Sequence, residues 1–296
     1  MKLIALALGL ILEHLATEML HLRELRWFDR YYDFGLARAR QARGWLIYLV
    51  VLAVLAVPTL PVLLISFGLQ GTEILWDVAY LSFAVLVVFL CLGPRDLGSE
   101  VDEYCAALDQ GDAESAERLL REMSEAELAD SSEIEAVEDA VFVQANNRIF
   151  GVIFWFIVLG PVGAWIFRVA DLLRRRAAFE SIRAAEPPTD VSAAIEAIYG
   201  LLKWIPARLA MLGYALSGSF DDAMNRWRSF DSSPGAPIDK RNDELVASVG
   251  KAAMTGFLDE PPNSSAAARN SMRLVTRTLF IWVTVIALMT IFGWAL

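Results

Sequence analysis

The feature that most constrains this chain is an apolar stretch at residues 146–173 that cannot be one ordinary transmembrane helix. Its sequence, NNRIFGVIFWFIVLGPVGAWIFRVADLL, is mostly as apolar as a bilayer span, but Gly160, Pro161 and Gly163 interrupt its middle. Hydrocarbon offers no replacement partner for a broken backbone hydrogen bond, and proline removes one donor. We therefore expect a broken or re-entrant hairpin that bends or reverses in a protein-lined space. Such broken segments at membrane depth are where binding sites tend to be built.

Other apolar runs indicate that the chain is an all-α, polytopic membrane protein. It has 296 residues, of which 56% are hydrophobic. An apolar run of about 18 residues or more is long enough to cross a bilayer as a helix. We expect about four to six membrane-embedded helices in a single domain that covers the whole chain. The predicted membrane segments are residues 3–20, 45–69, 74–93, 149–173, 195–217 and 274–296.

Residues 96–147 form a polar insert with sixteen aspartates and glutamates and only two arginines. Its apolar residues follow a helical pattern. Asp112 is a good N-cap for a helix, and Glu135 stands in capping-box position after a break at residues 130–132. The acidic residues have two interpretations. They form solvated helix faces, or they form a carboxylate cluster for Mg²⁺, which prefers oxygen ligands.

The arginines predict the orientation of the chain in the membrane. The segment 21–44 holds six of them among aromatic residues, which is typical of a cytoplasmic, membrane-surface segment. The insert and a polar loop at 218–272 are then cytoplasmic as well. If 149–173 crossed once, the basic run Arg174–Arg176 would lie outside. Re-entry of the hairpin keeps this run cytoplasmic. Alternatively, 149–173 crosses once and 195–217 crosses back, so that the last span starts from the cytoplasmic side as before. Both arrangements stay open.

Several charged residues lie within predicted membrane segments. Ionisable groups at this depth are costly and normally face a protein interior or a water-filled cavity. Glu13, Arg168 and Asp171 are of this kind, and Arg208 follows Pro206 in a mostly apolar helix. For Glu13 the alternative is a wet position at the membrane interface. For Arg168 the alternative is an anchor whose charged end reaches the headgroups.

Charge and motifs exclude some classes of function. The net charge of −10 and the absence of a basic stripe with aromatic residues argue against nucleic acid as a partner. The sequence has no phosphate-binding loop of the Walker type, no nucleophile with a partner base, and no zinc-ligand spacing. The two cysteines have no spacing that suggests a disulfide or a metal site. We predict no metal site from these patterns.

Four blocks of sequence resemble the AmpE family, within the wider CobD/CbiB family of membrane proteins. They are the N-terminal helix with Glu13, the acidic ALDQGDAESAERLLREMSEAEL, the block NNRIFGVIFWFIVLGPVGAWIFR, and WIPARLAMLGYALSG. The resemblance covers essentially the whole chain. It implies a multi-pass protein of the bacterial inner membrane, with a sensor or signalling role in cell-wall recycling and in the β-lactam and β-lactamase induction response.

The CobD/CbiB branch makes adenosylcobinamide phosphate with ATP and Mg²⁺, so it implies an amide-forming enzyme as the alternative function. In this chain Val143 stands where that branch has Glu, Gln144 where it has Asn, and Asn147 where it has Asp. Val143 cannot bind a metal, and Asn147 is a neutral ligand at best. Arg168 and Arg208 are retained. The pocket is therefore expected to bind an anion, while Mg²⁺ and ATP remain cofactors of the alternative only.

These interpretations leave three functions in view. The first is a non-enzymatic membrane sensor that binds an anionic small molecule, and the second is the ATP-dependent enzyme. The third is an accessory subunit of a transporter. Expected partners are the lipid bilayer and either a second copy of the chain or a membrane partner protein. The candidate ligand-binding residues are Glu13, Gln144, Asn147, Arg168, Asp171 and Arg208, and the candidate hairpin residues are Gly160, Pro161, Gly163 and Pro206.

Overall fold

The computed structural model describes residues 2–15, 28–69, 74–93, 96–124, 132–184, 189–231, 235–255 and 263–292. Its regular elements in these ranges are all helical, which confirms the predicted all-α class. In chain order they are α1 (Lys2–Leu15), α3 (Asp29–Ala39), α4 (Trp45–Gly68), α5 (Ile74–Cys91), α6 (Leu97–Asp109), α7 (Ala113–Ser124), α8 (Glu133–Ala145), the π-helix η3 (Asn146–Phe150), α9 (Gly151–Leu159), α10 (Pro161–Ala184), α11 (Asp190–Ser217), α12 (Phe220–Ser229), α13 (Ile238–Ala253) and α14 (Ser264–Ile291).

Among the described residues, three helical stretches are long and apolar enough to cross a membrane. They are Trp45–Gly68, Glu133–Leu159 and Ser264–Ile291, and the shorter helix Leu75–Cys91 is also apolar. This supports a membrane protein. The larger number of four to six embedded helices stays a prediction, as do the cytoplasmic positions of the insert and of the loop at 218–272.

One long helical rod runs from the acidic insert into the apolar centre of the protein. α8, η3 and α9 follow one another without a break, and the residues that join them, Asn146 and Gly151, both keep right-handed helical backbone angles. The expected insert ended at residue 147, yet the helix continues through that position. A change from acidic to apolar composition does not interrupt the backbone hydrogen bonds, because each helical N–H bonds to a backbone carbonyl of the preceding turn.

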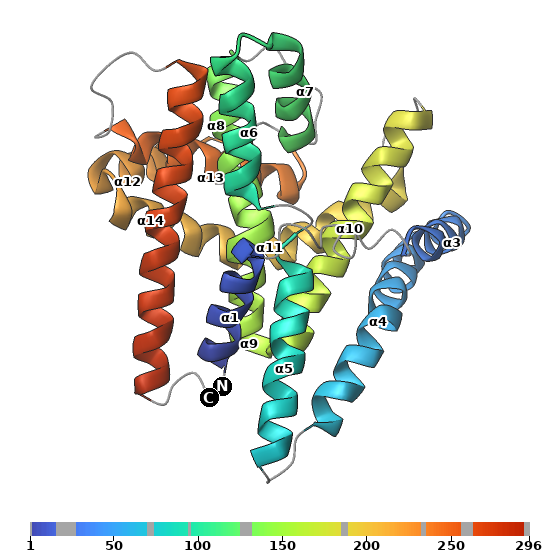
Figure 1. Ribbon diagram of the computed structural model, residues 1–296. Coiled ribbons are helices and arrows are strands. Elements are labelled where there is room, and N and C mark those ends of the chain that lie inside the picture. Colours follow the sequence, from blue (N-terminus) through green and yellow to red (C-terminus); the bar gives the residue numbers. More distant parts are fainter. Residues whose placement is uncertain are drawn as a thin grey trace.

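The chain reverses directly after this rod, as Figure 1 shows between α9 and α10. Gly160 ends α9 with φ at +67°, a conformation that side chains strongly disfavour, and Pro161 then begins α10. A Cβ atom at Gly163 would lie 2.3 Å from the carbonyl oxygen of Trp155, so α9 and α10 pack closely here. Residues 149–173 are thus two helices in a hairpin. Re-entry of this hairpin into the membrane stays a prediction.

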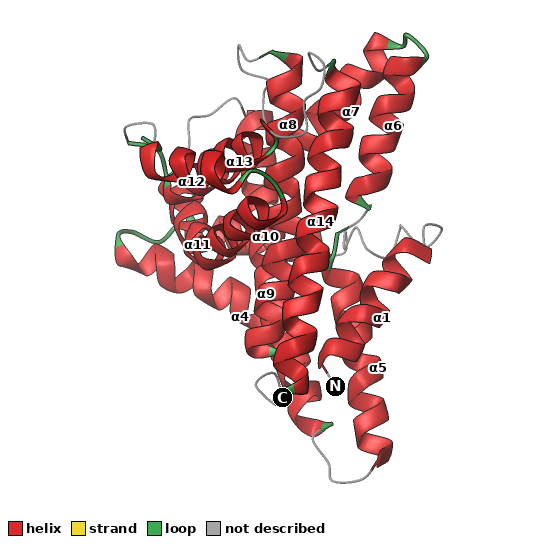
Figure 2. Ribbon diagram, turned by 90° about the vertical axis from the view of Figure 1, so that its left-hand side faces the viewer, coloured by secondary structure: helices red, strands yellow, loops and turns green. Residues whose placement is uncertain are grey.

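Helix α11 lies across the bundle rather than along it. It runs sideways past the upright α14 in Figure 1 and is seen nearly end-on in Figure 2. At the crossing, a Cβ atom at Gly213 would meet the methyl group of Thr278 at 2.5 Å. The hydroxyls of Ser217 and Thr278 are 2.6 Å apart. α11 contains the predicted segment 195–217, and its place in the membrane stays a prediction.

The acidic helices gather at one end of the molecule, beside α13 and the first turns of α14 (Figure 1). Both expected caps are present: Asp112 accepts the N–H of Ser115 at 3.1 Å, and Ser132 accepts the N–H of Glu135 at 3.3 Å. The hydroxyl of Tyr104 donates to Glu133 at 2.7 Å and ties α6 to α8. This contact places α6 against α8, the first part of the rod that carries the candidate site.

Candidate functional site

The centre of the site is the carboxylate of Asp171 on α10, which accepts hydrogen bonds from three arginines of the same helix. Arg168 donates at 3.1 Å, Arg174 at 3.0 Å and Arg175 at 2.8 Å. Asp171 and Arg168 are fully buried, with side chains 1% and 3% exposed, and the other two arginines are largely buried. Residues three and four apart share one face of a helix, which is why one carboxylate can meet all three.

A second group of side chains, on the α8–η3 rod, extends this charge cluster. Gln144 accepts from Arg148 at 2.8 Å and from Arg175 at 3.5 Å, and it donates to the carbonyl of Met123 at 2.8 Å. Arg148 also donates to Glu100 of α6 at 2.8 Å. Arg148, Arg168, Arg174 and Arg175, together with Gln144, Glu100 and Asp171, are called the arginine cluster below. It contains four cations, and two of its members, Glu100 and Asp171, are carboxylates that accept hydrogen bonds from them.

The π-helix beside the cluster holds buried amides that lack hydrogen bonds. Asn146 is fully buried, and neither polar atom of its side chain has a partner. Asn147 is also buried, and its carbonyl oxygen has none. On the cationic side, the Nε atom of Arg168 likewise has no partner. Most buried polar groups in proteins are paired, and π-helical turns occur frequently at functional sites, so these atoms mark a candidate binding site.

A second charged group lies on α11 and α13. Lys203 is fully buried and forms ion pairs with Asp239 and with Asp243, the latter at 2.8 Å. The ring of Tyr199 contacts both this group and the arginine cluster, because the charges of Arg174 and Lys203 lie 5.1 and 5.0 Å from its centre. Burial raises the pKa of Asp243 to about 6, while the charge of Lys203 opposes that rise. The two groups therefore meet through one aromatic ring.

The structure brings together part of the predicted set. Gln144, Arg168 and Asp171 belong to the arginine cluster, and Asn147 is buried in the adjoining π-helix. Glu13 lies in α1, but its side chain is outside the described part of the chain. Arg208, one turn of α11 beyond Trp204, donates to the Trp204 carbonyl and to Asn242 instead of joining Asp171, and its charge stacks over the Trp204 ring at 4.1 Å.

The sequence did not predict four members of the cluster, which are Arg148, Arg174, Arg175 and Glu100. Arg174 and Arg175 belong to the basic run that was used to predict the orientation in the membrane, and Glu100 is one of the acidic residues of the insert. A usable signal was present, because Arg168, Asp171 and Arg175 are spaced by three and four residues and so share one helix face. The buried Lys203 had no local signal, since its partners lie 36 and 40 residues further along the chain.

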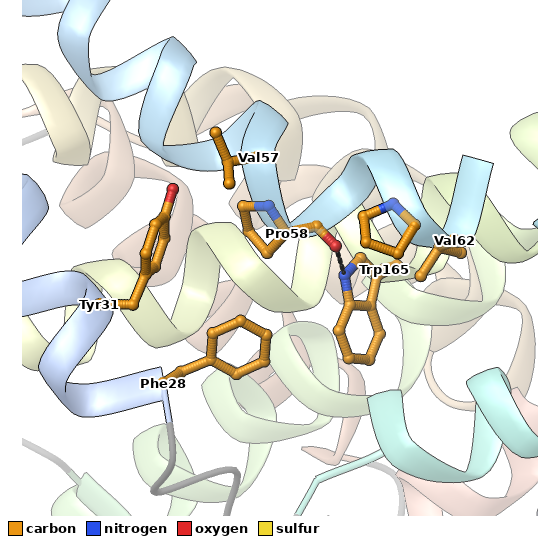
Figure 3. A pocket seen from close by; sticks show the side chains of 7 residues that line it. Phe28, Tyr31, Val57, Pro58, Val62 and Trp165 are labelled. Atoms are coloured by element: carbon orange, nitrogen blue, oxygen red, sulfur yellow. Dashed lines mark hydrogen bonds between the residues drawn. The ribbon is translucent and has the colours of Figure 1, made fainter. Parts of the chain in front are cut away.

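An apolar pocket of about 350 Å³ lies beside the cluster, between α3, α4 and α10 (Figure 3). Its lining residues are Phe28, Tyr31, Val57, Pro58, Pro61, Val62 and Trp165. Phe28 stacks on Tyr32 with ring centres 5.5 Å apart. Burial raises the pKa of Tyr32, and the positive charge of Arg168 opposes that rise, so the charge of the cluster acts on Tyr32 behind this wall of the pocket.

The donor set of the cluster does not fit Mg²⁺. The described residues contain no group of three or more acidic, histidine or cysteine side chains that could hold a metal ion. The carboxylates of the cluster are engaged by arginines, and Mg²⁺ would have to compete with those cations for them. The arrangement is suited instead to an anion, since guanidinium groups match carboxylate and phosphate oxygens in pairs.

Comparisons with known proteins place the chain in a family. The family model described as "Regulatory signalling modulator protein AmpE" matches residues 1–296. Protein AmpE of Shigella flexneri is 24% identical over 76% of this chain and 78% of its own length. The cobalamin biosynthesis protein CobD of Chromobacterium violaceum is 25% identical over 70% of this chain and 72% of its own length.

The CobD protein of Stutzerimonas stutzeri is 28% identical over 52% of this chain, and the chain spans about half of that relative's length. No solved structure matches. The match to the family model extends over every residue of the chain, and the structure adds the membrane-type helices. This chain belongs to the AmpE family of regulatory signalling modulators, with CobD proteins as distant relatives.

Proposed function

We propose that this protein is a signalling modulator of the bacterial inner membrane that binds an anionic small molecule at the arginine cluster. The observation that carries the proposal is the gathering of the four arginines of the cluster, among which the fully buried Arg168 keeps an Nε donor without a partner. The charges of Asp171, Arg175 and Arg148 all act on Arg168. An anion that entered the cluster would accept a hydrogen bond from this donor of Arg168 and would be attracted by the surrounding guanidinium groups.

The hydrogen-bonding atoms support the same ligand class. Arg168 has a donor without a partner, and Asn146 adds a buried amide with both polar atoms unpaired. A phosphate or carboxylate group accepts several N–H donors at once, and a hydrogen bond between charged groups is about twice as strong as a neutral one. Binding of such a group would therefore be favoured by charge and by the loss of unpaired donors.

The proposed role in the cell follows from the family and not from the geometry. We propose that the ligand reports on cell-wall recycling, and that the protein modulates the response to β-lactams and the induction of β-lactamase. The acidic helices α6 to α8 are proposed to face the cytoplasm, where a partner could sense a change in the cluster through the contact of Arg148 with Glu100.

The test compares two arginines of α10 in a strain whose own copy of the gene is deleted. Arg168→Gln removes a buried cation of the cluster. Arg176→Gln is the matched control, because Arg176 lies on the same helix but pairs with Asp33 of α3. With equal amounts of protein in the membrane, we expect Arg168→Gln to alter β-lactamase induction and Arg176→Gln to leave it at the wild-type level. Equal induction in both strains would refute the proposed role of the cluster.

The alternative is an ATP- and Mg²⁺-dependent enzyme that forms an amide bond, which the distant CobD relatives favour. The poor fit of the cluster to Mg²⁺ argues against it. Calorimetric titration of the purified protein with Mg·ATP separates the two functions. The modulator proposal expects inorganic phosphate to bind without help from Mg²⁺. Nucleotide binding that requires Mg²⁺ and is lost in Arg168→Gln would favour the enzyme.

A further inference from the structure

The pocket beside the arginine cluster is lined by hydrocarbon, although two of its residues carry polar groups. Pro58 has no N–H, so the carbonyl of Val54 loses its helical partner, and the hydroxyl of Tyr31 donates to it at 2.7 Å. The indole N–H of Trp165 donates to the carbonyl of Pro58 at 2.9 Å, as the dashed line in Figure 3 shows. Both polar groups thus bond to the backbone, and the pocket presents an apolar lining to any occupant.

The rim of the pocket lies on a helix that is long and apolar enough to cross the membrane. Val57 lines the pocket and is 53% exposed, and Leu60 and Leu64 on the same helix are 49% and 68% exposed. Leucines and valines that are exposed on a helix of this length and composition are suited to face the hydrocarbon of a bilayer. The pocket would then open toward the bilayer at Val57.

The opposite wall of the pocket adjoins the arginine cluster. Trp165 lies three residues before Arg168 on α10, and Phe28 stacks on Tyr32, on which the charge of Arg168 acts. The pocket volume of about 350 Å³ is within the range of small-molecule sites, which is roughly 300–1,000 Å³. One molecule with an apolar chain and a charged end would satisfy both surfaces.

We propose that the ligand is an anionic amphiphile, whose hydrocarbon chain fills the pocket from the bilayer while its phosphate or carboxylate end reaches the arginine cluster. This inference rests on the proposed function, because it adds the chemical class of the ligand to the same anion site. A chain that enters from the bilayer leaves one apolar environment for another. The charged end of the ligand therefore supplies most of the selectivity of binding. Among anions, the pocket favours those that carry a hydrocarbon chain.

The test uses alkyl phosphates as probes for the protein in nanodiscs of phosphatidylcholine. A decyl phosphate with a photoreactive group at the chain end is crosslinked to the protein, and the labelled residues are mapped by mass spectrometry. We expect label at Val57 and Val62 of α4, because the chain end lies on the side of the pocket away from the arginine cluster. Unlabelled decyl phosphate should compete at least about tenfold better than decyltrimethylammonium, which has the same chain and the opposite charge, a ratio that corresponds to 1.4 kcal/mol.

Two tryptophan variants of α4 test the pocket itself. Val57→Trp narrows the rim, and Leu60→Trp is the control, because Leu60 is similarly exposed on the same helix but does not line the pocket. We expect Val57→Trp to lose most of the label and Leu60→Trp to keep it. Equal labelling in the two variants, or label spread evenly over the exposed face of α4, would overturn the inference.

A parallel titration with inorganic phosphate separates this inference from the proposed function. Phosphate binding that Arg168→Gln abolishes and Val57→Trp leaves intact supports the anion site. If phosphate binds in this way but Val57→Trp is labelled as strongly as wild type, only the amphiphile inference fails. If phosphate does not bind, or binds equally to Arg168→Gln, the proposed function fails. Equal competition by decyl phosphate and decyltrimethylammonium would show that the pocket accepts any chain, and would overturn the anionic class.

Discussion

Replacement of Asp171 by asparagine should destabilise the protein strongly, although the side chain changes by a single atom. The carboxylate accepts from three arginines and is 1% exposed, and Arg168 beside it is 3% exposed. Removing one member of a buried ion pair leaves an uncompensated buried charge and costs about 3–5 kcal/mol. Arg174 and Arg175 retain some contact with solvent, so most of this cost arises at Arg168.

Thermal unfolding of the purified protein measures this cost. At roughly 2–4 °C per kcal/mol, the expected fall in Tm is about 6–20 °C. Asp33→Asn is the matched control, because Asp33 pairs with Arg176 but its side chain is 43% exposed. An exposed pair contributes about 0.2–1 kcal/mol, so the control should fall by at most ~4 °C. A Tm for Asp171→Asn that equals the control value would refute the buried pairing at the centre of the site.

Three further predictions concern the hairpin, the charged group on α13 and the pocket wall. Gly163→Val should destabilise the protein, because its side chain would collide with the facing carbonyl of α9, whereas Gly68→Val has open space and should change Tm little. Asp243 has a pKa raised to about 6, so its contribution to stability is present below its unfolded pKa and is lost as pH rises from about 4 to 6. Chemical unfolding at several pH values should show wild type losing stability relative to Asp243→Asn over this window, and a constant difference would contradict the shift. Tyr31→Phe should cost about 1–3 kcal/mol alone and less in a Pro58→Ala background, where the backbone carbonyl regains its helical donor; additive effects in unfolding measurements would exclude that coupling.

Local signals in the sequence predicted several elements of the fold correctly. The caps at Asp112 and Ser132 depend on residues three positions away, so their pattern is visible in the sequence. The lengths of the apolar runs are also visible in the sequence, and they predicted an all-α membrane protein. The end of α9 at Gly160 also follows from local chemistry, because glycine adopts φ of +67° readily and proline favours the first turn of the next helix.

The candidate site was harder to predict, because it depends on contacts between distant segments. The pairing of Arg148 with Glu100 joins residues 48 positions apart, and that of Lys203 with Asp239 joins α11 to α13. Arg208 lies in a mostly apolar helix, which suggested an internal position, yet its bond to Asn242 directs it away from Asp171. The orientation of α11 across the bundle decides this, and nothing in its own sequence specifies that orientation.

The continuity of α8 with α9 shows a different limit. The composition changes near residue 147, and that change suggested the end of the polar, cytoplasmic insert. The structure continues the helix and accommodates the transition with a π-helical turn at Asn146–Phe150. An extra residue in a helical turn rotates the following side chains, so the helical spacing read from the sequence does not carry across this point.

The most direct test of the account is calorimetric titration of inorganic phosphate into the purified protein in nanodiscs, with Arg168→Gln and Arg176→Gln measured alongside wild type. A hydrogen bond to a charged group contributes about 1.5–3 kcal/mol, which is roughly a tenfold to hundredfold change in affinity. The account predicts that phosphate binds to wild type and to Arg176→Gln with similar affinity, and at least about tenfold more weakly to Arg168→Gln. Equal affinity for all three proteins, or no binding to any of them, would contradict an anion site at the arginine cluster.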